Sequence, residues 1–174
     1  MRGHFSALVT AAFMLLEGSG LHAQDNGAQD NGARDNGATR IQIDWQEVMD
    51  RVSPAPESNI HVSRRISLVL KGGNQVDQDF SSSAGRYQQS SSKAMTLGGG
   101  VWHVGSTNTL VRQDDFPHHV RTISVRVSGK ACTASVAFRL KPGYRDYHTE
   151  MLSRPGETGT YSRLTSGYSR CSIM

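Results

Sequence analysis

The chain has 174 residues, with 19 Lys and Arg against 15 Asp and Glu, a formal net charge of +4 and two cysteines. This length fits one domain with a modest hydrophobic core. The basic residues are scattered, and zinc-finger spacing, a basic helix and an RNA-binding aromatic signature are all absent from the sequence. The composition therefore argues against a nucleic-acid-binding protein.

Residues 1–23 have the organisation of a signal peptide. The segment 1–4 (MRGH) is positively charged, and the apolar run 5–16 (FSALVTAAFMLL) ends at Glu17. A transmembrane helix needs about 20 apolar residues, so this run is too short to span a membrane. We expect cleavage after Ala23, with cleavage after Gly20 as the alternative, and export to the periplasm or the extracellular space.

Residues 24–40 (QDNGAQDNGARDNGATR) repeat a short phrase whose period matches neither a helix nor a strand. Ala is the only apolar residue type in it, so no burial offsets the entropy cost of ordering it. We predict a disordered tether. The spacing of Asp25, Asp30 and Asp35 does not match calcium-binding loops, so no metal site is expected there.

Residues 41–174 remain as a single predicted domain. It holds 16 Lys and Arg against 11 Asp and Glu, a net charge of +5. Such a bias favours anionic partners, and because export argues against nucleic acid, an acidic glycan or an envelope protein is the expected partner.

The start of this domain predicts one short helix. Asp44 and Glu47 have the spacing of a capping box, and Pro54 would end the helix. Apolar residues follow Asp44 at spacings of three and four: Trp45, Val48, Met49 and Val52. We expect this stripe to pack on a β core.

From residue 60 the pattern changes to that of β-strands. Residues 60–70 alternate apolar and polar side chains, which predicts a half-buried antiparallel strand, and 75–80 can return beside it. The serine-rich segment 81–92 is predicted to be a loop or an exposed edge strand. Residues 101–104 and 110–112 form a predicted hairpin.

The stretch 121–140 (RTISVRVSGKACTASVAFRL) predicts a hairpin with Gly129 and Lys130 at its tip. The expected cross-strand pairs are Ser128 with Ala131, Val127 with Cys132, Val125 with Ala134, and Ile123 with Val136. A slip of one residue would bury Arg126, so the register is well specified. Because export and an even cysteine count favour a disulfide, we predict a bond from Cys132 to Cys171.

Many short strands separated by turns, without alternating long helices, predict a mainly β fold. We expect an antiparallel β-sandwich with one short N-terminal helix, and a small barrel is the alternative.

Catalytic and metal signatures are weak. Ser90 and Lys93 match a Ser-X-X-Lys motif, but its partner motifs are absent. His118 and His119, near Asp114 and Asp115, are the best metal candidates. Neighbouring residues of an extended chain point to opposite sides, however, so we predict no metal and no cofactor. A non-catalytic binding module is favoured, and a small secreted hydrolase with a Ser/His site is the alternative.

The C-terminal part offers a candidate ligand surface. If Cys171 points inward, alternation places Tyr168 and Arg170 together on the opposite face. An aromatic plane beside a guanidinium suits sugars and carboxylates or phosphates. The candidate ligand-binding residues are Tyr144, Arg145, Tyr147, Tyr168 and Arg170.

Overall fold

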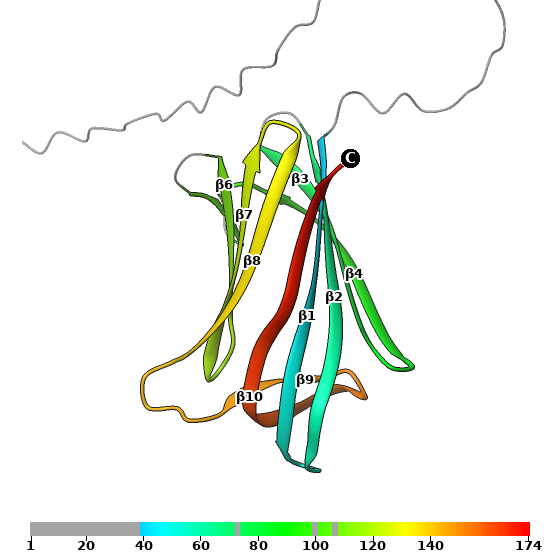
Figure 1. Ribbon diagram of the computed structural model, residues 1–174, viewed down its shortest axis with the longest axis vertical. Helices are drawn as coiled ribbons and strands as arrows, with labels where there is room; N and C mark the ends of the chain where they lie inside the picture. The colour runs from blue at the N-terminus through cyan, green and yellow to red at the C-terminus, as the bar shows by residue number, and fades with distance from the viewer. Residues whose placement is uncertain (1–38, 72–73, 99–100, 106–107) are drawn as a thin grey trace, which may run out of the picture. The chain divides into compact units, whose positions relative to one another are not determined.

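The computed structural model describes residues 39–71, 74–98, 101–105 and 108–174. These residues form antiparallel β-strands connected by turns (Figure 1). The strands are β1 (Thr39–Ser53), β2 (Glu57–Leu70), β3 (Gln75–Ala84), β4 (Tyr87–Thr96), β5 (Trp102–Val104), β6 (Thr109–Asp115), β7 (His119–Ser128), β8 (Ala131–Leu140), β9 (Tyr147–Met151) and β10 (Arg154–Ile173). The mainly β prediction is therefore confirmed.

The strands form two sheets that pack face to face, as expected for a sandwich. The larger sheet has the order β4-β3-β2-β1-β10-β9, and the smaller has the order β5-β6-β7-β8. Their shared core includes Trp45 of β1, Leu68 of β2 and Ile123 of β7, all fully buried. A second cluster around Met49 and Tyr161 continues this core along the larger sheet.

The predicted N-terminal helix is wrong, because its residues belong to strand β1. In β1 the buried residues alternate strictly: Ile41, Ile43, Trp45, Glu47 and Met49. β1 pairs with β2 on one side and β10 on the other. A central strand satisfies its backbone groups on both edges, and this pairing overrides a helical spacing of apolar residues.

Several other strand predictions are confirmed. β2 contains the predicted strand 60–70, and β3 pairs with it. β5 pairs with β6, and the serine-rich segment from residue 87 onward is the exposed edge strand β4. Residues 81–84 of that segment belong instead to the interior strand β3, where Ser82 is buried, so the prediction of a loop or an exposed edge strand is wrong for them. The β7–β8 hairpin has the expected register, including Val127 opposite Cys132, and Gly129 takes a φ of 60° at its tip.

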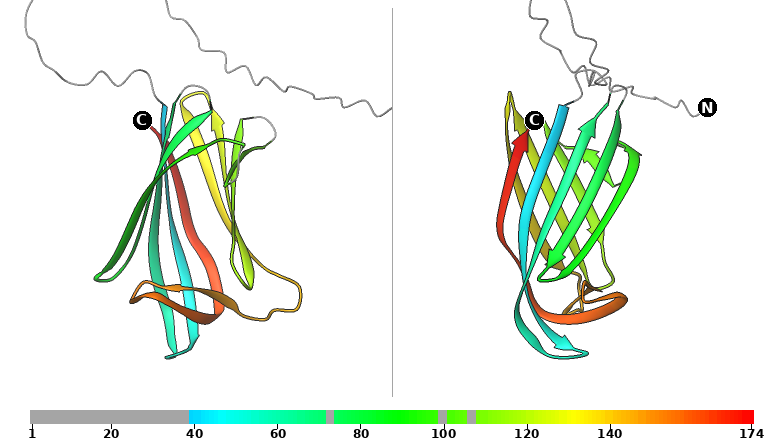
Figure 2. Two further views of the ribbon diagram at one scale, coloured as in Figure 1. Left: turned by 180° about the vertical axis from the view of Figure 1, so that it is seen from behind. Right: turned by 90° about the vertical axis from the view of Figure 1, so that its right-hand side faces the viewer.

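A disulfide joins β8, an edge strand of the smaller sheet, to the part of β10 that lies beyond its pairing with β9. Cys132 of β8 and Cys171 of β10 are bonded, with 5.5 Å between their Cα atoms, which confirms the predicted pair. Ser169 Oγ of β10 donates a 2.7 Å hydrogen bond to the carbonyl oxygen of Ala134 on β8. Figure 1 and both views in Figure 2 show these two strands side by side.

At the other end of the domain the two sheets diverge. Figure 1 shows β4 leaning away from β6 and β7, with the segment that contains β9 crossing between the sheets. This divergence positions the pocket described below.

The predicted signal peptide lies outside the described residues, as does the predicted tether except for Thr39 and Arg40, which begin β1. The described part of the chain contains no helix with the length and hydropathy to span a membrane.

Candidate functional site

Three charged side chains meet inside the sandwich. Glu47 of β1 lies between Arg64 of β2 and Arg121 of β7, and their side chains are 2%, 9% and 7% exposed. Glu47 Oε1 accepts a 3.0 Å hydrogen bond from Arg121 Nη1, and Oε2 lies 2.9 Å from Arg64 Nε. Trp45 Nε1 also donates to Oε1 at 3.0 Å. One buried carboxylate thus neutralises part of two buried guanidinium charges.

The cluster continues across the smaller sheet. Arg121 Nε donates to Asp114 Oδ2 at 2.9 Å, and Asp114 Oδ1 lies 2.7 Å from Arg112 Nη2. Arg112 in turn donates to Gln78 Oε1. The buried charge network comprises Glu47, Arg64, Arg121, Asp114 and Arg112. Its three arginines exceed its two carboxylates by one positive charge.

The arginines hold the pKa values of both carboxylates below their ordinary range. Burial is the largest influence on the pKa of Glu47 and would raise it, but the charges of Arg64 and Arg121 outweigh burial and lower it. At Asp114 burial likewise raises the pKa, and Arg121 and Arg112 reverse the effect. Both carboxylates are therefore ionised at neutral pH.

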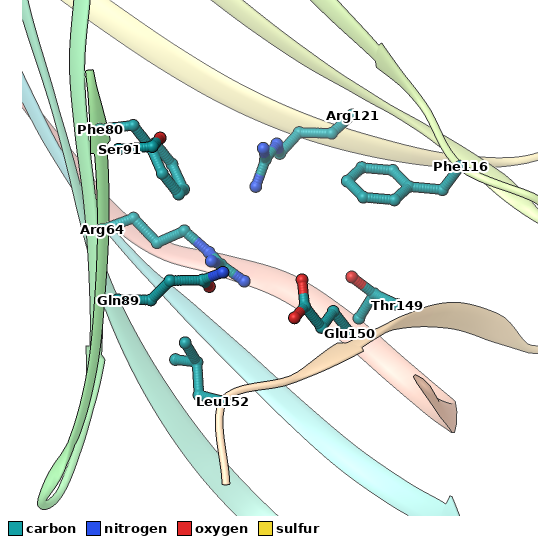
Figure 3. Close-up of a pocket in the computed structure, with 9 residues that line it drawn as sticks. All are labelled: Arg64, Phe80, Gln89, Ser91, Phe116, Arg121, Thr149, Glu150 and Leu152. Carbon is teal, nitrogen blue, oxygen red and sulfur yellow. The ribbon is translucent and has the colours of Figure 1, made fainter. Parts of the chain in front are cut away.

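A pocket of about 190 Å³ opens beside this network, in the region where the sheets diverge. Figure 3 shows the Arg64 and Arg121 side chains reaching into it from opposite sheets. Its lining residues are Arg64, Phe80, Gln89, Ser91, Phe116, Arg121, Thr149, Glu150 and Leu152. We call it the arginine pocket.

Aromatic rings support the two guanidinium groups. Arg121 Cζ lies 5.4 Å from the centre of the Phe116 ring and 5.6 Å from that of Trp45. Arg64 Cζ lies 5.8 Å from the ring centre of Phe80. These distances are those of cation–π contacts, which hold the cations in place without neutralising their charge.

Arg64 retains hydrogen-bonding capacity toward the pocket. Its Nη1 donates to Ser82 Oγ at 2.6 Å, and its buried Nε has no well-directed acceptor. Among the described residues, no protein group accepts a hydrogen bond from Nη2 of Arg64. Figure 3 shows the Glu150 carboxylate facing this guanidinium across the pocket. Glu150 is exposed, and its Oε1 accepts a 3.0 Å hydrogen bond from Gly156 N.

The five residues predicted to bind a ligand do not form one site. Tyr168 and Arg170 share an exposed face of β10, with Arg170 Cζ 5.4 Å from the Tyr168 ring centre. Tyr147 is paired with Tyr161, much farther along β10, and Arg145 is exposed in the preceding loop. Tyr144 stacks on His118 with ring centres 4.2 Å apart.

His118 and His119 point to opposite sides, as expected for neighbours in an extended segment. His118 contacts Tyr144 and His148, whereas His119 is buried and stacks on Phe116 at 4.5 Å. Burial first, and the charge of Arg121 second, lower the pKa of His119 to about 4. No group of three or more potential metal ligands occurs among the residues that the structure describes.

The serine and histidine side chains of the alternative hydrolase prediction are not paired in the part of the chain that the structure describes. No serine hydroxyl in residues 39–71, 74–98, 101–105 and 108–174 is hydrogen-bonded to a histidine ring. Ser90 and Lys93 of the Ser-X-X-Lys match lie on opposite faces of β4, because they are an odd number of residues apart on a regular strand.

Sequence reasoning missed the arginine pocket, although one signal pointed to it. Arg64 has the same parity as Val62 and Ile66 on β2, and Arg121 has the same parity as Ile123 on β7. A charged residue at an inward position on each of two strands indicates a buried polar site.

None of the protein-family models, curated proteins or solved structures compared with this chain matches it.

Proposed function

We propose that this chain is an exported, non-catalytic binding module that takes a carboxylate of an envelope or extracellular component into the arginine pocket. The observation that carries the proposal is the pair of guanidinium groups, Arg64 and Arg121, lining one pocket between the sheets. Arginine suits carboxylates because its planar donors form charge-assisted hydrogen bonds with them.

The surroundings of the pair favour a small anionic group. The network carries one positive charge in excess, which the exposed Glu150 carboxylate of the lining opposes in part, and the low-polarity walls of Phe80 and Phe116 strengthen its field. At about 190 Å³ the pocket is smaller than the sites that enclose drug-sized ligands. It therefore suits the acidic end or side group of a larger molecule, such as a uronic acid of a glycan or an acidic side chain of a protein.

Export is the second part of the proposal. It is supported by the signal-like segment 1–23 and by the bond between Cys132 and Cys171, since disulfides persist in oxidising compartments. N-terminal sequencing of the chain recovered outside the cytoplasm should begin at Gln24. Recovery of an uncleaved chain in the cytoplasm would contradict this part.

The binding proposal is tested by titrating glucuronate and glucose into the protein, followed by calorimetry. We expect binding of glucuronate alone, weakened about tenfold or more by Arg64→Gln, because a charge-assisted hydrogen bond is lost. The matched control is Arg170→Gln, which removes an exposed arginine of the outer face and should leave the affinity unchanged. Loss of binding in Arg170→Gln alone would assign the ligand to the Tyr168 surface instead.

A further inference from the structure

Strand β4 forms one edge of the larger sheet. It pairs with β3 along its whole length, from Ala84 opposite Tyr87 to Gln75 opposite Thr96, without a register shift. The opposite edge of β4 is the end of the sheet, so its backbone groups are not used by another strand of the described chain. Such an edge can pair with an additional strand.

The core-facing side of β4 is also uncovered over residues 89–93. Gln89, Ser91 and Lys93 lie opposite Ser82, Phe80 and Gln78, whose side chains face the smaller sheet. All three β4 residues are nevertheless exposed, whereas Gln78 and Ser82 are buried. The smaller sheet therefore covers β3 but leaves this part of β4 open, whereas Met95 near the end of β4 packs against the core.

This edge has few of the features that usually prevent strand pairing. Natural edge strands are protected by proline, by bulges, by charged side chains such as an inward-pointing Lys, or by short length. β4 (YQQSSSKAMT) has no proline and no bulge, and Lys93 is its single charged residue. A hollow of about 290 Å³ lined by serine and glutamine side chains runs along the β3–β4 hairpin.

The charges beside the edge are mostly positive. Gln89 and Ser91 line the arginine pocket together with Arg64, Arg121 and the exposed carboxylate of Glu150. Lys93 follows two residues later on the same side, with no carboxylate in ion-pair contact among the described residues. A strand placed beside β4 would therefore meet Lys93 directly on its core-facing side, and it would meet the arginine pocket where Gln89 and Ser91 line it.

We infer that β4 accepts an extended peptide segment of an envelope protein, which adds a strand to the larger sheet and places a core-facing carboxylate in the arginine pocket. This inference rests on the proposed function and names its partner. Strand addition uses backbone hydrogen bonds for affinity and alternate side-chain pockets for specificity. A glycan could fill the pocket but would leave the backbone row of β4 unpaired, so the edge favours a peptide.

The probe is the acetylated and amidated peptide KTVTETVTK, in which Glu and both Val residues share one face. A second peptide replaces Glu by Gln. We expect the Glu peptide to bind about tenfold more tightly than the Gln peptide, because only the first carries a charge for the guanidinium pair. Hydrogen exchange of the full chain should show new protection at alternate amides of residues 88–94, since successive N–H groups of a strand point to opposite edges.

Two variants of β4 test which face of this strand contacts the peptide. Ser91→Glu puts a carboxylate at the arginine pocket and should reduce peptide affinity about tenfold, whereas Ser92→Glu puts the same charge on the outer face and should leave it nearly unchanged. Both residues are exposed, so neither variant should impair folding. Equal losses in the two variants would overturn the inference.

The remaining outcomes separate this inference from the proposed function. If glucuronate binds with the expected dependence on Arg64 but the peptide leaves β4 unprotected, strand addition is wrong and the proposed function stands. If neither glucuronate nor the Glu peptide depends on Arg64, both are wrong. Concentration-dependent dimerisation through β4 without peptide, measured by sedimentation, would assign the edge to a second copy and overturn the inference.

Discussion

Glu47 and Arg121 connect the two sheets through a buried 3.0 Å hydrogen bond between opposite charges. Glu47 belongs to the larger sheet and Arg121 to the smaller, and the pair lies beside the arginine pocket. The same carboxylate also balances Arg64. Glu47 is therefore expected to hold both pocket arginines in place, and its removal should affect stability as well as binding.

Glu47→Gln should lower the free energy of unfolding by about 3 to 5 kcal/mol, because it leaves two buried guanidinium groups without their shared counter-charge. Urea denaturation followed by far-ultraviolet circular dichroism would measure the loss. The control is Asp44→Asn on the same strand, whose carboxylate pairs with the exposed Arg65. A surface pair of this kind should contribute less than about 1 kcal/mol. A loss in Glu47→Gln as small as the one expected for Asp44→Asn, below about 1 kcal/mol, would show that the Glu47 charge is not needed.

Acid should destabilise the fold through the same carboxylates. Because the folded state lowers the pKa of Glu47 below 4.5 and that of Asp114 below 3.8, the unfolded chain binds protons more readily. The stabilisation that these two carboxylates contribute is complete at pH values above their pKa values in the unfolded chain. It is lost as the pH falls through their pKa values in the folded state. Denaturation from pH 6 to pH 3 should show this loss, and Glu47→Gln should show a shallower slope.

His119 should add a separate dependence at higher pH. Its pKa is about 4 when folded and 6.5 in the reference state, so the unfolded chain gains a proton between these values and the fold loses stability as the pH falls through them. His119→Phe keeps an aromatic ring against Phe116 and should flatten the stability curve in that window. The same substitution at exposed His103 is the control and should leave the curve unchanged. A His119→Phe curve parallel to wild type would contradict the expectation.

The hairpin and the disulfide could be predicted because local rules agreed with the fold. Gly129 supplies the positive φ that a tight turn requires, and a register slip at Cys132 would have buried Arg126. Strand β2 was recognisable because Val62, Ile66 and Leu68 alternate with polar residues. In these segments apolar side chains mark the core and polar ones mark solvent.

The same assumption failed at the buried charge network. Glu47 interrupts the alternation of Ile43, Trp45 and Met49, so a helical spacing matched the apolar residues better than a strand did. For the same reason, the sequence pattern does not distinguish Arg64 and Arg121 from the other scattered basic residues. An inward-pointing charge finds a buried partner only where β1, β2 and β7 meet across the sandwich. The local sequence pattern of one strand does not show which other strands it will meet.

Removing the disulfide should weaken the edge where β8 and β10 meet. Cys132→Ser with Cys171→Ser should cost about 2 to 5 kcal/mol, since the bond closes a loop with a sequence separation of 39. Thermal denaturation of the double variant beside wild type measures this. Ser169→Ala, which removes the neighbouring hydrogen bond to Ala134, should cost only about 1 kcal/mol. Unchanged thermal stability in the double variant would contradict a stabilising role for the bond.

Glu150 should oppose anion binding from the mouth of the arginine pocket. Its exposed carboxylate faces Arg64, so it repels an incoming carboxylate and competes for the same guanidinium. Glu150→Gln should therefore tighten glucuronate binding about threefold to tenfold at low ionic strength, and added salt should reduce the gain by screening.

The control is Glu157→Gln, which changes the net charge of the protein by the same amount. Glu157 does not line the pocket, and its carboxylate pairs with Arg154. The affinity of this variant for glucuronate should therefore stay near that of wild type. Calorimetric titrations at two salt concentrations distinguish the variants. If both raise the affinity equally, net charge rather than the pocket attracts the ligand; if Glu150→Gln weakens binding, the carboxylate contributes to the site instead of opposing it.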